Sequence, residues 1–362
     1  MLAVAAAFAL ACSGDVKYDV TGINAPEDGA VVYLTDRLSS AHIDSAVVAD
    51  GSFRMKGKAD KDAFMAVTLG DGSWLYIFFN DGKPVTIDVP AKTVTGSALN
   101  NKLTECDLRN TAAYEEYRAF IQAFTALPEE EQEAKMVEFI SQYQAKLDEY
   151  SKVVMDIIEE NEDNLVPVAF MEPVPSLFGD DKFEELLEKD VPYAKHPYVL
   201  ELKRKLDESN AKMDESEAKK KAFIGQKFED LEEADAEGNL HKLSEYVGQG
   251  KWVLVDFWAA WCGPCKAEMP NVVAAYKKYH DKGFDVVGLS FDRNKEDWVK
   301  AIKDWGMPWI HLSDLQYWQS VAAGVYSVNS IPDNLLIDPE GTVVARGLRG
   351  EALKARLAEI FE

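Results

Sequence analysis

The sequence predicts a C-terminal α/β domain over 222–362, preceded by a small all-β domain over 13–98 and a helical region with a linker over 99–221. Three observations support this division. Short β-branched and aromatic runs between turn signals fill the first segment, apolar residues at helical spacing fill the second, and strand-like and helix-like stretches alternate in the third. A chain of 362 residues is also long enough for two or three hydrophobic cores.

The prediction of an N-terminal β domain depends on three apolar runs and the turns around them. The runs are 31–34, 64–69 and 74–79. Sequences such as Asp-Gly and Gly-Asp-Gly separate them, and such residues mark turns because they accept the backbone conformations that turns require. This spacing favours a small β-sandwich or barrel.

Apolar side chains in the middle region recur in alternating steps of four and three residues: Met136, Ile140, Tyr143, Leu147, Tyr150, Val154 and Ile157. This pattern predicts an amphipathic helix that begins after Pro128. The helix either packs on neighbours within its own layer or forms a self-associating coiled coil. A second helix is expected over 198–206, and the polar stretch 207–221 is expected to form the boundary with the last domain.

Predicted strands and helices alternate in the last domain. Strands are expected at 252–258, 284–291, 335–338 and 342–345, and helices at 262–280, 295–304 and 351–361. The turn between the last two strands contains Pro339 and Gly341, which are typical turn residues. Alternation of this kind predicts a mixed sheet with helices on both faces.

The charge balance is strongly acidic. The chain holds 39 basic and 63 acidic residues, which gives a net charge of −24. Such a surface repels phosphate backbones, so nucleic-acid binding is not expected. An acidic, solvated surface is the interpretation that this composition favours.

The N-terminus resembles an export signal. Residues 1–11 are apolar and uncharged, and they are too few to span a bilayer, which takes about 20 residues. The sequence Ala9-Leu10-Ala11-Cys12 resembles the lipobox of bacterial lipoproteins. That resemblance implies a lipid on Cys12 and a protein that is anchored to a membrane of the cell envelope and faces the periplasm. A plain cleaved signal and a buried N-terminus are the alternatives.

Two of the four cysteines form a close pair in the sequence Trp261-Cys262-Gly263-Pro264-Cys265. The pair directly follows an apolar strand and opens a predicted helix. Unpaired N–H groups and the helix dipole at that position favour negative charge, so the pKa of the Cys262 thiol is expected to fall and its thiolate to act as a nucleophile. Cys265 lies one helical turn further on, where it can resolve a mixed disulfide. Pro264 is tolerated because first-turn amides have no intrahelical partner.

The cysteines also allow other interpretations. A zinc site usually needs four ligands at matching spacing, and the sequence has no second Cys-x-x-Cys pair and no paired histidines. A permanently oxidised, structural Cys262–Cys265 pair is a further alternative. Cys106 stands alone between the β and helical regions and is expected to be a small buried apolar residue.

An acidic residue interrupts the apolar strand that precedes the cysteine pair. This residue, Asp256, lies six positions before Cys262. Burial in the strand should raise the pKa of its carboxyl group. The carboxylate would then be suited to accept the proton of Cys265 as that thiol attacks a mixed disulfide. A purely local hydrogen-bonding role is the alternative.

The stretch 255–266, with the sequence VDFWAAWCGPCK, closely resembles thioredoxin. Pro270 and the pair Ile331-Pro332 lie where thioredoxins carry a helix proline and a cis-proline that faces the dithiol. From residue 224 onward the chain resembles the membrane-tethered TlpA/ResA branch, and its N-terminal β domain resembles that of exported Bacteroidota thioredoxins. The glutamate that this branch carries after the second cysteine corresponds to Glu268.

The resemblance implies a thioredoxin-like fold and a thiol–disulfide oxidoreductase that reduces disulfides of exported proteins. A membrane electron donor would recharge it, and no metal or cofactor beyond the Cys262–Cys265 disulfide is implied. Glu268 joins Asp256 as a candidate catalytic acid. The residues expected to line the groove for the substrate peptide are Trp261, Gly263, Pro264, Ile331 and Pro332. Oligomeric state is left open.

One residue departs from the thioredoxin pattern. The position after Pro332 is commonly threonine in thioredoxins, and here it is Asp333. An acid beside the dithiol would disfavour the thiolate or select basic partners.

Two other functions belong to different classes of protein. A thiol peroxidase of the peroxiredoxin type would carry a threonine three residues before the reactive cysteine, where this chain has Ala259. A binding or scaffold lipoprotein would use the N-terminal β domain for its main role and the redox domain as an auxiliary.

Overall fold

The computed structural model of the chain describes residues 14–26, 28–70 and 76–362, and the expected signal and lipobox with Cys12 lie outside these residues. The chain divides into two compact units, Met1–Asp207 and Glu208–Glu362. Each unit is described by itself. Within the described residues, no helix combines the length and the apolar character needed to cross a bilayer.

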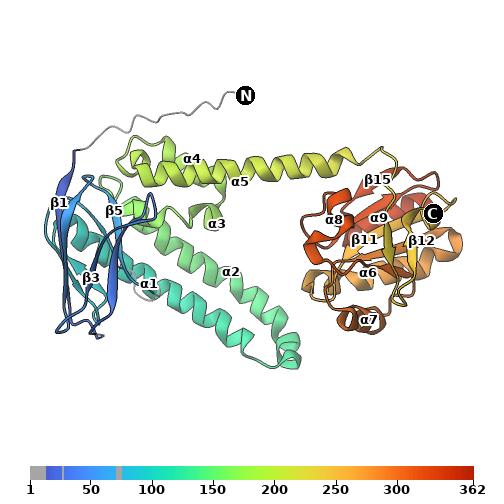
Figure 1. Cartoon of the computed structure of the whole chain (residues 1–362), viewed down its shortest axis with the longest axis horizontal. Coiled ribbons are helices and arrows are strands. Elements are labelled where there is room, and N and C mark those ends of the chain that lie inside the picture. Colours follow the sequence, from blue (N-terminus) through green and yellow to red (C-terminus); the bar gives the residue numbers. More distant parts are fainter. Residues whose placement is uncertain (1–13, 27, 71–75) are drawn as a thin grey trace. The chain divides into compact units, whose positions relative to one another are not determined.

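The N-terminal unit begins with two four-stranded sheets, in the orders β4-β1-β7-β8 and β3-β2-β5-β6 (Figure 1). Alternate side chains of these strands, such as Val20, Leu34 and Val67, are fully buried and form one core. The predicted all-β segment is therefore confirmed. The strands are β1 Val16–Ile23, β2 Val31–Asp36, β3 Ala41–Val47, β4 Phe53–Ala59, β5 Phe64–Leu69, β6 Tyr76–Phe79, β7 Val85–Asp88 and β8 Thr93–Thr95.

Helices complete this unit, as predicted. The long helices α1 and α2 pack against each other, and Tyr150, Val154 and Ile157 of the predicted stripe lie in a second core. Met136 and Ile140, at the other end of the stripe, are exposed. The helical elements are α1 Ala98–Thr125, α2 Glu129–Glu160, η1 Val166–Phe170, α3 Val174–Phe178, α4 Asp180–Glu188, η2 Tyr193–Lys195 and α5 Pro197–Ala222. The polar stretch 207–221 is thus part of helix α5.

The C-terminal unit contains a five-stranded mixed sheet in the order β13-β12-β11-β14-β15. Nearly every residue of β11, β12 and β14 is buried, which shows that both faces of the sheet are covered and confirms the predicted α/β domain. The strands are β11 Trp252–Trp258, β12 Phe284–Ser290, β13 Ile310–Leu312, β14 Asp333–Ile337 and β15 Val343–Arg346, with a separate hairpin of β9 Glu232–Ala234 and β10 Leu240–Lys242. The helical elements are η3 Leu243–Glu245, α6 Gly263–Tyr279, η4 His280–Lys282, α7 Lys295–Asp304, η5 Tyr317–Gln319, α8 Val321–Val325 and α9 Gly350–Phe361.

The direction of three strands positions the site. Strands β11, β12 and β13 are parallel neighbours. Their carboxyl ends therefore meet at one edge of the sheet, where ligand sites of α/β proteins commonly lie. The segments 259–262, 291–294 and 313–316 emerge at that edge.

Candidate active site

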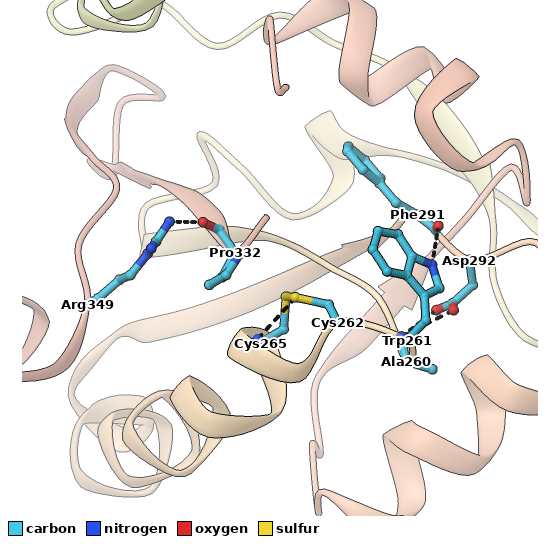
Figure 2. Close-up of a disulfide and its surroundings, with 8 residues drawn as sticks. All are labelled: Ala260, Trp261, Cys262, Cys265, Phe291, Asp292, Pro332 and Arg349. Atoms are coloured by element: carbon cyan, nitrogen blue, oxygen red, sulfur yellow. Dashed lines mark hydrogen bonds between the residues drawn. A yellow bond between two sulfur atoms is a disulfide. The ribbon is translucent and has the colours of Figure 1, made fainter. Parts of the chain in front are cut away.

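Cys262 and Cys265 form a disulfide at the start of helix α6 (Figure 2). Their Cα atoms are 5.2 Å apart. Cys262 is the N-cap residue of the helix, and its Sγ accepts a hydrogen bond from the backbone N–H of Cys265 at 3.1 Å. Cys262 keeps the larger exposed fraction, 4% against 1% for Cys265. An incoming sulfur therefore meets Cys262 first.

The position of Cys262 explains how it can become a nucleophile. Helix α6 begins only a few residues after the buried strand β11, so the sheet core fixes where the helix starts. Once the disulfide is reduced, the unpaired N–H groups of the first turn and the helix dipole stabilise a thiolate there. The N–H that now donates to the Cys262 sulfur is one of these groups. Pro264 occupies the first turn, where it interrupts no hydrogen bond, and Pro270 lies inside the helix.

Asp256 is buried in β11, with 3% of its surface exposed. Burial raises the pKa of its carboxyl to about 7, and the negative charges of Glu268 and Asp333 act in the same direction, while Arg349 opposes them. The raised pKa that the sequence predicted is therefore present. A carboxyl group with this pKa exchanges a proton near neutral pH, as a proton acceptor for a resolving thiol must.

Glu268 links two helices. One carboxylate oxygen accepts a hydrogen bond from the backbone N–H of Gly350 at 2.8 Å, at the start of α9, and the other accepts one from Asn271 at 3.1 Å. Glu268 thus ties the active-site helix α6 to α9, and its charge also raises the pKa of Asp256. These contacts give Glu268 a positioning role that the sequence did not indicate.

The Ile331–Pro332 peptide bond is cis, as the sequence predicted. Pro332 faces the disulfide in Figure 2, and its carbonyl accepts a hydrogen bond from the Arg349 guanidinium on the far side. Ile331 packs against the core of the unit. The structure therefore brings Ile331 and Pro332 to the same end of the sheet as the cysteines.

Asp333 does not act as a free acid beside the dithiol. Its Oδ2 accepts hydrogen bonds from Nε and Nη2 of Arg346 at 3.0 and 2.7 Å, and both side chains are only 5% exposed. The expected bias against the thiolate or toward basic partners is therefore offset within the protein. Sequence reasoning missed Arg346 because the pairing depends on the β14–β15 register, which brings residue 346 opposite Leu335.

Trp261 is held in a fixed orientation at the exposed end of the motif. Its Nε1 donates to the Phe291 carbonyl at 3.1 Å, and the neighbouring Ala260 N–H donates to the buried carboxylate of Asp292 (Figure 2). Burial raises the pKa of Asp292, although the hydrogen bonds from the Ala260 N–H and the Ser290 hydroxyl oppose that shift. The Trp261 side of the site was predicted, but Asp292 was not.

Cys106, which lies outside the disulfide, is a packed residue. It is 2% exposed, and burial raises the pKa of its thiol, as expected. Across the described parts of the chain, no group of three or more histidine, cysteine or acidic side chains is placed to hold a metal ion.

Comparison with known proteins agrees with this geometry. Residues 224–346 match the AhpC/TSA family, and residues 14–103 match a domain of unknown function, DUF4369. The thiol–disulfide oxidoreductase ResA of Bacillus cereus is 32% identical over 139 residues, which cover 38% of this chain and 77% of that protein. ResA of Bacillus thuringiensis subsp. konkukian is 30% identical over 147 residues, or 39% and 79% of the two chains.

Two solved structures resemble the same region. The thioredoxin domain of a thiol–disulfide oxidoreductase from Bacteroides vulgatus is 34% identical, with 38% of this chain and 98% of that chain covered and a TM-score of 0.36. A thiol–disulfide oxidoreductase from Bacteroides fragilis NCTC 9343 is 29% identical, with 37% and 99% covered and a TM-score of 0.36.

A thioredoxin-like sheet with a Cys-x-x-Cys disulfide at a helix start defines a thiol–disulfide oxidoreductase. Within that class, the identity to the Bacillus proteins over more than two thirds of their length places the chain plainly: it belongs to the ResA-like thiol–disulfide oxidoreductases. It is an enzyme of that family, with a DUF4369 domain at its N-terminus.

Proposed function

We propose that this protein reduces disulfides of exported proteins, with Cys262 as the nucleophile and Cys265 as the resolving thiol. The observation that carries the proposal is the position of Cys262 as the N-cap of α6, where its sulfur accepts the Cys265 N–H. Only one of the two sulfurs has this stabilisation for its anion. The order of attack follows from that asymmetry.

The proposed reaction has two steps. The Cys262 thiolate forms a bond to one sulfur of the client disulfide, and the other client sulfur leaves as a thiolate that takes up a proton. Cys265 then gives its proton to the Asp256 carboxylate and bonds to Cys262, which releases the first client sulfur. The client disulfide gains two electrons, and the enzyme ends with the Cys262–Cys265 disulfide seen in the structure.

The proposed setting follows from the N-terminal sequence, which lies outside the described residues. An apolar stretch ending in Cys12 supports export and a lipid anchor facing the periplasm. A reductase in an oxidising compartment needs electrons from elsewhere, so we propose a membrane donor that reduces the Cys262–Cys265 disulfide. Its client proteins are those that carry disulfides in the same compartment.

Trapping with insulin tests the roles of the two cysteines. Reduced Cys265→Ala protein is expected to accumulate a mixed disulfide with an insulin chain, because the thiol that would release the chain is gone. The Cys262→Ala protein, which lacks the nucleophile, is the matched control and should form none. Non-reducing electrophoresis and mass spectrometry measure the adduct. An adduct on Cys262→Ala but not on Cys265→Ala would reverse the roles, and no adduct on either would overturn the proposal.

A further inference from the structure

A pocket of about 480 Å³ lies beside Trp261. Figure 2 shows Trp261 and Asp292, which both line this pocket, on one side of the disulfide and Pro332 on the other. The pocket therefore shares Trp261, the chain neighbour of Cys262, with the predicted peptide groove, but it extends away from the Pro332 side of that groove. Its walls come from the segments after β11, β12 and β13, and from helix α7.

One wall of the pocket is formed by three side chains in contact. The rings of Trp261 and Tyr317 lie with centroids 4.9 Å apart and are tilted by 49° to each other. The guanidinium of Arg293 lies 4.0 Å from the centre of the Tyr317 ring, within range of a cation–π interaction. These contacts hold the Arg293 charge at the pocket wall beside Trp261, which is the neighbour of Cys262 in the chain.

The loop that carries Tyr317 has an unusual backbone. Leu315 and Tyr317 have φ angles of 57° and 59°, in the left-handed region that bulky residues rarely occupy. Such conformations cost free energy and persist where surrounding contacts hold them, often at binding sites. Here the conformation places Tyr317 between Trp261 and Arg293.

The charges at the pocket leave two cations unpaired. Arg293 and Lys266 have no acidic partner within residues 14–26, 28–70 and 76–362. Among the acids of the pocket, Asp292 is buried and bonded to the Ala260 N–H, and Asp304 pairs with Lys300. Asp297, the third acid that lines the pocket, likewise has no cationic partner in the described residues, so two unpaired cations face one unpaired acid. Two such cations beside the dithiol stand out in a chain whose net charge is −24.

We propose that this pocket is a subsite for an acidic side chain that flanks the client's disulfide. The inference rests on the proposed disulfide-reductase function and names the clients that the site favours: acidic peptide segments. The aromatic faces of Trp261 and Tyr317 pack against the stem of the client residue, and Arg293 and Lys266 attract its carboxylate.

Single-turnover kinetics with three synthetic peptides test the proposal. The peptides share one cystine ring and differ only in their flanks, which are glutamate, glutamine or lysine. Reduced full-length protein supplies the two electrons, and stopped-flow tryptophan fluorescence gives a second-order rate constant. At about 0.15 M salt, which screens the chain's net charge of −24, the glutamate peptide is expected to react faster than the lysine peptide by about tenfold. At low salt the ratio should fall, because the acidic surface as a whole then repels the glutamate peptide.

A charge-reversal variant assigns the preference to the pocket. Arg293→Glu should lower the ratio of glutamate-peptide to lysine-peptide rates by about tenfold, while Arg293→Gln should lower it by less. Lys282→Glu makes the same change of charge at η4, beyond the opposite end of α6, and should leave the ratio unchanged. The ratio does not depend on the overall activity of a variant, so a partly unfolded preparation does not mimic the result.

The possible outcomes distinguish failure of the acidic subsite from failure of the proposed disulfide-reductase function. If no peptide is reduced, the proposed reductase function fails. If all three peptides are reduced at equal rates, or if Arg293→Glu keeps the wild-type ratio, the reductase function stands and the acidic subsite is wrong. A preference for the lysine peptide would also overturn the subsite.

Discussion

Asp256 shows how one buried residue couples the fold to the chemistry. It lies in the apolar strand β11, where burial raises the pKa of its carboxyl to about 7. In the unfolded chain the same group has a pKa of 3.8. Between these two values the unfolded chain releases its proton while the folded protein retains it. Stability therefore falls as pH rises from about 4 to 7, and then levels off.

Replacing Asp256 by asparagine should remove this dependence on pH. Each unit of pKa difference is worth about 1.4 kcal/mol, so Asp256→Asn should gain up to about 4 kcal/mol relative to the wild type between pH 4 and pH 8. Guanidinium unfolding of the oxidised proteins at pH 4 and pH 8 measures this difference in the free energy of unfolding. Tryptophan fluorescence is a suitable signal because seven of the eight tryptophans lie in the C-terminal unit.

An exposed acid of the same unit gives the control. Salt bridging to Lys300 lowers the pKa of Asp304, so this group is ionised across most of the range in either state. Asp304→Asn should show little change with pH above 5. A gain for Asp256→Asn that is equal at pH 4 and pH 8 would contradict the assigned pKa.

Sequence reasoning found the residues that a local pattern marks and missed those that tertiary pairing brings in. Asp256 was predicted because a charge is costly to bury, so an acid inside an apolar strand indicates a chemical role. Arg346, by contrast, lies one residue beyond the predicted strand 342–345, and nothing in the sequence shows that it neutralises Asp333. Tyr317 was missed for a similar reason: its role depends on a left-handed backbone in a loop with no sequence signal.

At the scale of elements, the packing of the His311 ring of β13 against the Trp258 ring of β11 depends on one glycine in the strand between them. Gly288 of β12 pairs with Asp256 on one side and His311 on the other. A Cβ at position 288 would lie 2.3 Å from the His311 Nδ1 and 2.8 Å from the Trp258 Nε1. The His311 ring therefore occupies space that any larger residue would need. Burial lowers the pKa of His311 to about 3, so the ring packs as a neutral group.

Adding one methyl group at this position should destabilise the C-terminal unit. Gly288→Ala is expected to cost about 1–3 kcal/mol, as overpacking in a closed core does. The double variant Gly288→Ala/His311→Ala should lose less stability than the sum of its single changes, because the closer clash is absent without the His311 ring and the Trp258 ring can move into the space it leaves. Guanidinium unfolding measures all three variants. Strict additivity would show that the glycine is not required by His311.

Most helices and strands could be predicted from the sequence. The reason is visible in the contrast between elements that are fully buried and one that is buried only in part. Continuous apolar runs indicated the central strands of the C-terminal unit because both faces of these strands are buried, and the helices were predicted from the stretches between them. The stripe on α2 was more difficult to interpret. Its end near Ile157 is buried, but Ile140 is 61% exposed. The amphipathic pattern therefore did not show which part of the helix packs against other elements.

At the scale of the whole molecule, each compact unit has its own hydrophobic core. The core of the C-terminal unit includes Trp258 and Leu335 and draws on residues of that unit alone. The N-terminal unit has two cores, one around the β-sheets and one among the helices. A unit with a closed core of this size can fold without the rest of the chain.

A fragment of residues 208–362 should therefore fold and reduce insulin on its own. We expect its second-order rate constant to stay within about twofold of the full-length value, since the dithiol, Asp256 and the cis-proline all lie in this unit. Stopped-flow fluorescence gives the rate, and circular dichroism checks the fold. A folded fragment with a rate reduced by about tenfold or more would show that the N-terminal unit, with its β-sheets and helices, contributes to the reaction with this substrate.

The meeting of three strand ends at one edge has an evolutionary consequence. The sulfur pair follows β11, whereas Arg293 follows β12 and Tyr317 follows β13. In the proposed subsite, substitutions in the latter two loops would change which client segments dock, while the cysteines of the redox couple, which follow β11, stay unchanged. Descendants of one ancestral gene could then diverge in the molecules they accept while inheriting the same electron-transfer machinery.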